Sequence, residues 1–409
     1  MLDARHPALS RVAALDTAAG GLAVDLGLYA LSALLALIIA LTATLPTHRS
    51  WGWIASVGYA IATAVVLVQL ATRRASLPSR AALTVVTWAA TALVPLVVEA
   101  ASGRAQDEVV TIEHAGARLL HTGTPYLSHD AIAALPVDQR LLAYLPYQPG
   151  MALFGLPRAA FGAVWWTDAR VWFAVATAVA LALAIRQLPW SPRTIRALQV
   201  ATVLPVCSLT LAVGGDDLPV LALCLLALAY ASRDRPGAAG IAVGLAGALK
   251  LFAWPVAVVL LFLPFNRRRY TIGAFGLPVL ALVPAFVVDP DAALENIVRF
   301  TLGRGLVRST AATNFPGHLI AIHGGSAIAA ALLVAAGIAI GGWLIRRPPR
   351  DAPAAALICA LGLLTAILLM PATRFGYLLY PAAYAVWASA LPPGAAEGRA
   401  QPRSATRSA

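Results

Sequence analysis

The sequence is poor in charge and almost devoid of lysine. Only 12% of its 409 residues are charged, which is roughly half the share typical of soluble globular chains. Its 30 basic residues comprise arginines and a single lysine, Lys250. A soluble enzyme and a disordered chain are therefore both excluded. The preference for arginine, together with abundant alanine, is typical of a GC-rich genome such as that of an actinobacterium.

Several other signatures are missing. The three cysteines lie inside apolar runs without CxxC spacing, which argues against a disulfide or metal framework. The sequence has no GxxxxGK[ST], HExxH or GxSxG motif, and its first 21 residues contain no compact apolar stretch of the kind found in a signal peptide. The net charge of +12 resides in short loops between apolar runs, so a membrane-topology signal explains it better than nucleic-acid binding does.

Long apolar runs dominate the chain, in which 60% of the residues are hydrophobic. Runs of roughly 17 to 25 apolar residues are long enough to cross the hydrocarbon core of a bilayer. We therefore predict an all-α polytopic membrane protein with about 10–12 transmembrane helices and two long extracytoplasmic loops, 102–150 and 289–323. The regular runs are 22–46, 51–72, 81–101, 168–186, 197–213, 217–232, 270–288, 324–345, 353–370 and 374–391.

Two further apolar stretches are irregular. Residues 149–166 contain prolines and an arginine and are predicted to be interfacial or re-entrant, whereas 237–265 is too long for a simple span and is predicted to be a bent pair of short helices. The expected organisation is a cytoplasmic N-terminus at 1–21, a transmembrane domain at 22–391 and a disordered cytoplasmic tail at 392–409.

Basic and acidic residues separate between the loops. Most arginines lie in short loops that the positive-inside rule places in the cytoplasm together with both termini, and most acidic residues lie on the opposite face with the two long loops. Chemistry is therefore expected on the outer face.

Three acids, Asp107, Glu108 and Glu113, follow the third apolar run and begin a segment whose apolar residues recur at helical spacing. A carboxylate at a membrane surface can be desolvated and gain basicity, as a general base for an alcohol requires. The same acids could simply form the first turn of a surface helix, where the helix dipole favours negative charge.

Other candidates also have two interpretations. Asp216 and Asp217 could ligate a divalent cation or cap the following helix. Lys250 lies in an apolar stretch, where a charge is either functional or snorkels to the cytoplasmic interface. Tyr144 and Tyr147 could line a sugar or prenyl site or belong to an interfacial aromatic belt. Candidate phosphate ligands on the outer face are Arg299, Arg304, Arg308, His318 and Arg374.

In their order along the chain, these segments resemble the GT-C integral-membrane glycosyltransferases, most closely glycosyltransferase family 87, which includes actinobacterial polyprenol-phosphate-dependent mannosyltransferases. In this sequence Glu108 leads into Ala115-Gly116, Leu119-Leu120, Gly123 and Pro125-Tyr126, as the family's first outer loop does. The family's Tyr-x-Tyr-x-Pro element resembles Tyr144, Tyr147 and Pro149. Its glycine-rich helix that ends in lysine is similar to residues 239–250. The family usually has Asp where register here favours Glu108, and it places this acid after the first membrane helix rather than the third. Two N-terminal helices therefore look added.

The resemblance implies an inverting transferase that moves a sugar, with mannose favoured, from a polyprenyl-phosphate donor to a lipid or cell-envelope glycan acceptor on the outer face. Glu108, or its neighbour Asp107, would deprotonate the acceptor. The implied substrate-binding residues are Tyr144, Tyr147, Asp216, Asp217, Arg304, His318 and Arg374. Glu108 is expected to lie near Arg374 and His318. No cofactor is firmly predicted, although a divalent cation remains an option, and membrane lipids are expected partners.

A membrane transporter or flippase for a lipid-linked or small substrate is the main alternative. It would explain a lysine within the membrane and the bent segment 237–265, and it requires key charges near the middle of the membrane. It does not explain why acids and long loops gather on the outer face. A non-catalytic membrane scaffold is the third interpretation.

Overall fold

The computed structural model describes residues 18–74, 76–308 and 310–392. Within these ranges the chain is helical apart from turns, loops and one isolated bridge between Ala312 and Thr373. The predicted all-α fold is thereby confirmed. The tail at 393–409 and most of the predicted N-terminal segment lie outside the described residues.

Six described helical segments are long and apolar enough to cross a membrane. They comprise α2 (Leu22–Thr42), α3 (Pro46–Ala71), the continuous run of α4 (Leu77–Trp88), η2 (Ala89–Leu93) and α5 (Val94–Ala101), α16 (Arg267–Val288), α19 (Ser326–Arg346) and α20 (Ala352–Leu369). A seventh span is possible if α11 (Pro192–Thr202) and α12 (Pro205–Val213), which meet at a 42° bend, are counted as one.

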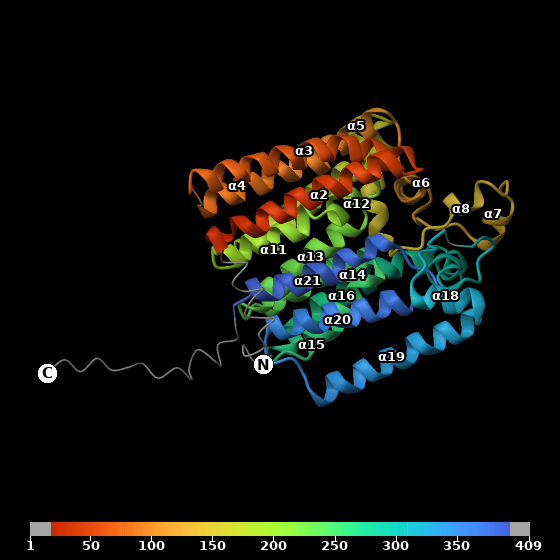
Figure 1. Ribbon diagram of the computed structural model, residues 1–409. Coiled ribbons are helices and arrows are strands. Elements are labelled where there is room, and N and C mark those ends of the chain that lie inside the picture. Colours follow the sequence, from red (N-terminus) through yellow and green to blue (C-terminus); the bar gives the residue numbers. More distant parts are fainter. Residues whose placement is uncertain (1–17, 75, 309, 393–409) are drawn as a thin grey trace.

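The remaining apolar helices are shorter and run alongside the long ones (Figure 1). They are α10 (Ala169–Ile185), α13 (Asp217–Ala231), α14 (Pro236–Leu249), η5 (Leu251–Ala253) with α15 (Trp254–Leu261), and η7 (Phe375–Leu378) with α21 (Leu379–Ala390). Our estimate of about 10–12 transmembrane helices included these shorter helices. Helix α13 matches the predicted run 217–232, and α14 and α15 form the predicted bent pair, in which α14 ends just before Lys250. Nearly all of α13 is buried by neighbouring helices.

The glycines of α14 allow unusually close packing against α16. A Cβ atom on Gly244 would lie 2.1 Å from the carbonyl oxygen of Gly273, and one on Gly240 would lie 2.2 Å from that of Tyr270. Such contacts between backbones are possible only where side chains are absent. The glycine-rich pattern of this segment is therefore a helix-packing feature that brings the end of α14 to a fixed position.

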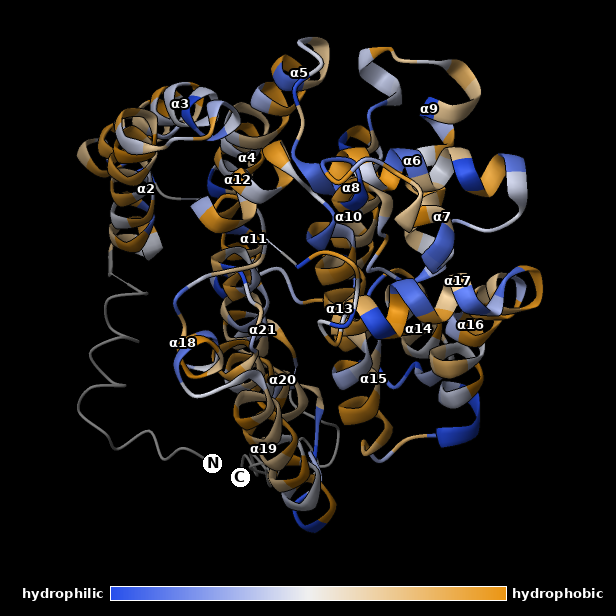
Figure 2. Ribbon diagram, turned by 90° about the vertical axis from the view of Figure 1, so that its right-hand side faces the viewer, coloured by the Kyte–Doolittle hydropathy of each residue, from blue (hydrophilic) through white to orange (hydrophobic). Residues whose placement is uncertain are grey.

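The bundle has two ends of different character (Figure 1), and Figure 2 looks onto the end that carries the long loops. Short turns gather at one end, which we call the arginine-rich end, and these turns together with the adjoining helix ends carry most of the arginines of the described residues. The turns are 72–74, 186–191, 232–235, 262–266 and 347–351. The opposite, cavity end carries both long loops. The first loop contains α6 (Asp107–Thr122), α7 (His129–Ala133), α8 (Arg140–Ala143), η3 (Pro149–Gly155), α9 (Leu156–Phe161) and η4 (Trp165–Thr167). The second contains α17 (Pro290–Leu294), η6 (Glu295–Phe300) and α18 (Pro316–His323).

Three local predictions are confirmed at the cavity end. Helix α6 is amphipathic and buries Val109, Ile112 and Ala115. The stretch 149–166 forms short helices rather than a span, and these pack on α6. The segment 237–265 breaks at Lys250, whose extended backbone (φ −153°, ψ 143°) separates α14 from η5.

Candidate active site

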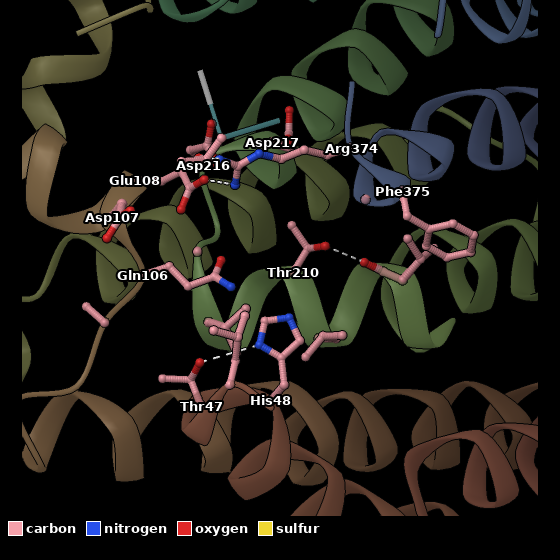
Figure 3. A pocket seen from close by; sticks show the side chains of 18 of the residues that line it. Thr47, His48, Gln106, Asp107, Glu108, Thr210, Asp216, Asp217, Arg374 and Phe375 are labelled. Atoms are coloured by element: carbon pink, nitrogen blue, oxygen red, sulfur yellow. Dashed lines mark hydrogen bonds and ion pairs between the residues drawn. The ribbon is translucent and has the colours of Figure 1, made fainter. Parts of the chain in front are cut away.

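A cavity of about 1040 Å³ lies at the cavity end, where segments that are distant in sequence converge. Its walls come from the second half of α2, one side of α12, the turn between α2 and α3 with the start of α3, and the residues before and in the first turn of α6. The turn 214–217, the break at Lys250 and the segments 310–313 and 374–377 complete them. Figure 3 shows acidic and basic side chains facing one another across part of this space.

Glu108 and Arg374 form an ion pair in the cavity (Figure 3). Glu108 lies in the first turn of α6 with its side chain 11% exposed, while Arg374 immediately precedes η7 and also donates from Nη2 to Thr310 Oγ1 at 3.1 Å. The adjacent Asp107 is exposed and lines the same cavity. The structure thus brings together the acid and the arginine that the sequence predicted to be neighbours.

Lys250 holds Asp216 and Asp217 in a buried cluster beside this pair. Its Nζ lies 2.7 Å from Asp216 Oδ2 and 2.5 Å from Asp217 Oδ1, and the Tyr380 hydroxyl donates to Asp217 Oδ1 at 2.7 Å. Asp216 makes no side-chain cap to α13, so a helix cap does not account for the two acids. Lys250 likewise does not snorkel to the arginine-rich end, because it lies at the cavity. A divalent cation bound by these carboxylates would have to compete with its ammonium group.

Aromatic rings surround the Lys250 ammonium. The ring centroids of Tyr147, Tyr377 and Phe252 lie 5.0, 5.2 and 5.7 Å from Nζ, which is within the range of cation–π attraction. Tyr147 and Tyr377 also line the cavity. The predicted role of Tyr147 in shaping the pocket is therefore compatible with its position.

The backbone around Lys250 is fixed by close contact with the segment that follows Tyr147. Gln148 donates its backbone N–H to the Leu249 carbonyl at 3.1 Å, and a Cβ on Gly150 would lie only 2.6 Å from the Ala248 carbonyl oxygen. On the other side of the cluster, Gly215 adopts φ +84°, which glycine tolerates without strain, and thereby turns the chain so that both acids face Lys250.

Arg170 holds the segment that precedes α6 in place. It is fully buried, is paired with Asp168 through Nη2 at 2.7 Å, and donates to the backbone carbonyls of Ala212 at 3.1 Å and Arg104 at 2.8 Å. One arginine thus joins the end of α12 to the segment that leads into Glu108. The sequence analysis assigned Arg170 no role, although an acid and an arginine two residues apart at the start of an apolar run were a usable signal.

Tyr144 lies outside the cavity lining and instead joins the two long loops. Its hydroxyl donates to Glu295 Oε1 at 2.7 Å and accepts from the Leu306 N–H at 2.9 Å, while its ring stacks on Phe300 at 4.2 Å. Burial raises the pKa of Tyr144 to about 12, so the hydroxyl stays protonated and can donate. The expectation that Tyr144 shapes the sugar pocket is not supported by this position.

The charge of Glu295 stabilises the same junction between the loops. Burial would raise the pKa of the Glu295 carboxyl, but hydrogen bonds from Tyr144, Arg299 and His129 outweigh that effect and lower it. Glu295 therefore remains ionised as the acceptor at the centre of this network.

Three other candidates also lie outside the cavity lining. Arg304 is exposed, and His318 is half-buried with Nδ1 2.9 Å from the carbonyl oxygen of Pro371. Glu113, the third acid of the first loop, pairs with Arg158 at 3.0 Å; burial raises the pKa of its carboxyl, and Arg158 opposes that shift. Neither Arg304 nor His318 joins Glu108 and Arg374 among the residues that line the cavity.

The sequence analysis missed a polar wall of the cavity altogether. Thr47, His48, Gln106 and Thr210 line it, and Figure 3 shows them on the side away from Asp216 and Asp217. These are ordinary polar residues near the ends of apolar segments, so nothing in their spacing distinguished them from surface positions.

The arrangement combines a carboxylate poised beside an arginine with a buried cationic and acidic cluster. Such a site can bind an anion through the guanidinium group and accept a proton on a carboxylate. Among the residues that the structure describes, no cluster of three or more His, Cys, Asp or Glu side chains has the geometry of a metal site.

Comparison with known proteins places the chain as follows. The family model of glycosyltransferase family 87 matches residues 144–371, which is more than half of the chain. Among solved structures, ArnT from Cupriavidus metallidurans bound to undecaprenyl phosphate is similar with 18% identity and a TM-score of 0.46, and its apo state with 17% identity and a TM-score of 0.43. In both cases 75% of this chain aligns and spans 59% of the ArnT chain. A search of curated proteins gave no significant match.

Proposed function

Because the chain belongs to glycosyltransferase family 87 and is a multi-pass membrane glycosyltransferase, we propose that it transfers a sugar from a polyprenyl-phosphate donor to a hydroxyl of a lipid or cell-envelope glycan. Mannose is the favoured sugar, by resemblance to the mannosyltransferases of this family, and arabinose is the next candidate. The single observation that carries this proposal is the pairing of Glu108 with Arg374 in the cavity.

In the proposed reaction the acceptor oxygen forms a bond to the anomeric carbon while the bond from that carbon to the phosphate oxygen breaks. The polyprenyl phosphate leaves with the bonding electrons, and Glu108 takes the proton of the acceptor hydroxyl. Arg374 stabilises the negative charge on the departing phosphate as a preorganised donor. A single displacement of this kind inverts the configuration at the anomeric carbon.

The pairing of Glu108 with Arg374 also suggests how the donor prepares the site. A phosphate that binds the guanidinium group competes with the carboxylate, because both are acceptors for the same planar donors. Donor binding would therefore release Glu108 and raise its basicity. Asp107 is the alternative base, but its greater exposure leaves it more strongly solvated, which favours Glu108.

The Lys250 cluster is proposed to bind the donor sugar. The carboxylates of Asp216 and Asp217 line the cavity and can accept hydrogen bonds from sugar hydroxyls, while Lys250 is paired with both of them. The Tyr147 ring offers an apolar face for sugar C–H groups.

The proposed orientation places the cavity on the extracytoplasmic side. Under the positive-inside rule, the turns of the arginine-rich end face the cytoplasm. The described chain begins and ends, at residues 18 and 392, near that end of the bundle (Figure 1), so both termini would be cytoplasmic. Lys250 lines the same cavity as Glu108 and Arg374, which supports a transferase over a transporter.

The test is donor turnover by the purified protein in lipid nanodiscs. Polyprenyl-phosphate-mannose and polyprenyl-phosphate-arabinose are offered separately with extracted cell-envelope lipids, and transfer is measured for the wild type, Arg374→Gln and Arg304→Gln. We expect wild-type transfer from one donor and at least a tenfold higher donor KM for Arg374→Gln, since a charged hydrogen bond is worth about 1.5–3 kcal/mol. Arg304→Gln is the matched control and should behave as wild type.

Two results would contradict the proposal. If the wild type binds neither donor, a transporter or a scaffold becomes the better interpretation. If Arg304→Gln impairs the donor KM and Arg374→Gln does not, the donor phosphate lies elsewhere.

A further inference from the structure

The polar wall that the sequence analysis missed differs chemically from the charged side of the cavity. It comprises Thr47, His48, Gln106 and Thr210, and we call it the neutral wall because it contains hydroxyl, imidazole and amide groups but no carboxylate, lysine or arginine. Figure 3 shows it below Glu108, Asp216 and Asp217, with Arg374 on their level. A ligand that fills the cavity from Arg374 to His48 thus meets two different surfaces.

Side chains of the neutral wall have hydrogen-bond donors and acceptors that the described part of the protein does not use. Within the part of the chain that the structure describes, no residue hydrogen-bonds to the side-chain amide of Gln106, and His48 has only a long contact of 3.5 Å from Nδ1 to Thr47 Oγ1. The Thr210 hydroxyl donates to the Val206 carbonyl at 2.6 Å, which leaves its oxygen free to accept. Amide, imidazole and hydroxyl groups together offer both donors and acceptors, as hydroxyl groups of a ligand require.

On this basis we propose that the neutral wall binds the hydroxyl-bearing head group of the acceptor, and that this head group is a neutral sugar or another polyol. The inference rests on the proposed transferase function. An anionic donor phosphate is drawn to Arg374, so the neutral side remains for the second substrate. Gln106 precedes Glu108 by two residues, so a head group held by the amide presents a hydroxyl close to the proposed base.

The occupant is expected to be uncharged because of the groups that face it. The neutral wall itself supplies no cation to pair with an acidic head group, and Arg104, which also lines the cavity, is already paired with Glu99 at 2.9 Å. The carboxylates of Asp107 and Glu108 would repel an acidic head group. A positively charged head group would find no acid on the neutral wall itself. Multiple hydroxyls therefore match this surface better than either charge does.

Hydrogen bonds join α3, which carries Thr47 and His48, to the neighbouring helices. Trp51 Nε1 on α3 donates to the Thr91 carbonyl at 2.8 Å, and the Tyr59 hydroxyl lies 2.7 Å from Ser208 Oγ on α12. These contacts fix Thr47 and His48 relative to Thr210. Three of the four side chains also lie outside residues 144–371, so acceptor choice would depend on a part of the chain that the family match does not cover.

Cysteine protection can separate the two surfaces without catalysis. The three native cysteines are buried, so His48→Cys and Thr310→Cys each introduce one reactive thiol, on the neutral wall and beside Arg374 respectively. Labelling by a water-soluble maleimide is timed in nanodiscs with octyl α-mannoside, with octyl sulfate as the anionic probe of equal chain length, or with undecaprenyl phosphate.

We expect octyl α-mannoside to slow the labelling of His48→Cys at least threefold and octyl sulfate to leave it unchanged. Undecaprenyl phosphate should slow the labelling of Thr310→Cys. Equal or better protection of His48→Cys by octyl sulfate would overturn the inference, because the alkyl chain or the charge would then be what binds. Protection of Thr310→Cys by undecaprenyl phosphate, with none of His48→Cys by the mannoside, would overturn the inference and leave the proposed function standing.

If undecaprenyl phosphate protects Thr310→Cys no better than octyl sulfate does, the proposed donor site fails. The response of His48→Cys to the mannoside still decides whether the neutral wall binds polyols.

Kinetics with the native acceptor extract provide a second measurement. Thr210→Val should raise the acceptor KM about three- to tenfold, the effect of one lost neutral hydrogen bond, and leave the donor KM unchanged. Thr63→Val is the matched control, because Thr63 makes the same kind of bond to the carbonyl four residues earlier but lies outside the cavity. A changed donor KM with an unchanged acceptor KM would assign the neutral wall to the donor instead.

Discussion

Among the buried ion pairs of the described residues, two clusters lie toward opposite ends of the bundle. At the arginine-rich end, Asp25 pairs with Arg80 at 2.6 Å and Arg196 at 2.8 Å. At the cavity end, Lys250 pairs with Asp216 and Asp217. Both are buried, but the second cluster lines the cavity of about 1040 Å³ and the first does not. Burial of charge therefore does not by itself mark a functional site, whereas contact with an accessible space does.

In the first cluster, the charged side chains also hydrogen-bond to other groups of the protein. Arg80 also donates to the Gly20 carbonyl at 3.0 Å, Arg196 to the Gly21 carbonyl at 3.2 Å, and Gln199 to Asp25 at 3.1 Å. These contacts join the first turns of α2, α4 and α11, so the cluster anchors the N-terminal helices to the rest of the bundle. Its role is structural. The cavity cluster, in contrast, can exchange hydrogen bonds with a substrate.

The largest effect is expected for Lys250→Met. Removal of the ammonium leaves two buried carboxylates without their cation, which should lower the free energy of unfolding by about 3–5 kcal/mol and transfer activity at least a hundredfold. Thermal unfolding and sugar transfer per folded molecule are the measurements. Wild-type transfer in this variant would show that the cluster has no part in substrate binding.

Arg80→Met should affect stability alone. Asp25 retains Arg196, so we expect a loss of about 3 kcal/mol in the free energy of unfolding and transfer within about twofold of wild type per folded molecule. The comparison with Lys250→Met is the sharpest test of the distinction between the clusters. If the two variants lose transfer activity to the same extent, the two clusters do not differ in function.

Gly116→Ala should give an intermediate effect. The added methyl group would lie 2.3 Å from the backbone of Gly155, so α6 must shift and the protein should lose about 1–3 kcal/mol of stability. Gly27→Ala on α2, where nothing lies within 4 Å, is the control and should be neutral or slightly stabilising. Unfolding temperatures that agree for the two variants would show that α6 is not closely packed there.

Tyr144→Phe should have the smallest effect. It removes the hydrogen bonds to Glu295 and from Leu306 but keeps the ring on Phe300, so a loss of about 1 kcal/mol in the free energy of unfolding is expected. The donor KM should stay within about twofold of wild type. A tenfold rise in donor KM with unchanged stability would instead return Tyr144 to the sugar site.

The spacing of residues along the sequence predicted those parts of the fold that depend on residues close together in the chain. Helical spacing indicated α6, and the length of 237–265 with Lys250 inside it indicated a break. The proximity of Glu108 to Arg374 followed from the resemblance to a family rather than from the residues themselves.

What the sequence could not show were contacts between distant segments. Tyr144 meets Glu295 across 151 residues, and Arg170 reaches two backbone carbonyls that carry no sequence signal. The neutral wall depends on how the α2–α3 turn docks beside α12, which is a matter of packing between helices.

The most direct test of the account is sugar transfer by Glu108→Gln beside Asp107→Asn, with donor binding measured separately in the same nanodiscs. Glu108→Gln removes the proposed base but keeps the shape of the side chain beside Arg374. We predict that it binds the donor and transfers no sugar, whereas Asp107→Asn retains most of its activity. Full transfer by Glu108→Gln, and by the double variant, would contradict the assignment of the base to this ion pair.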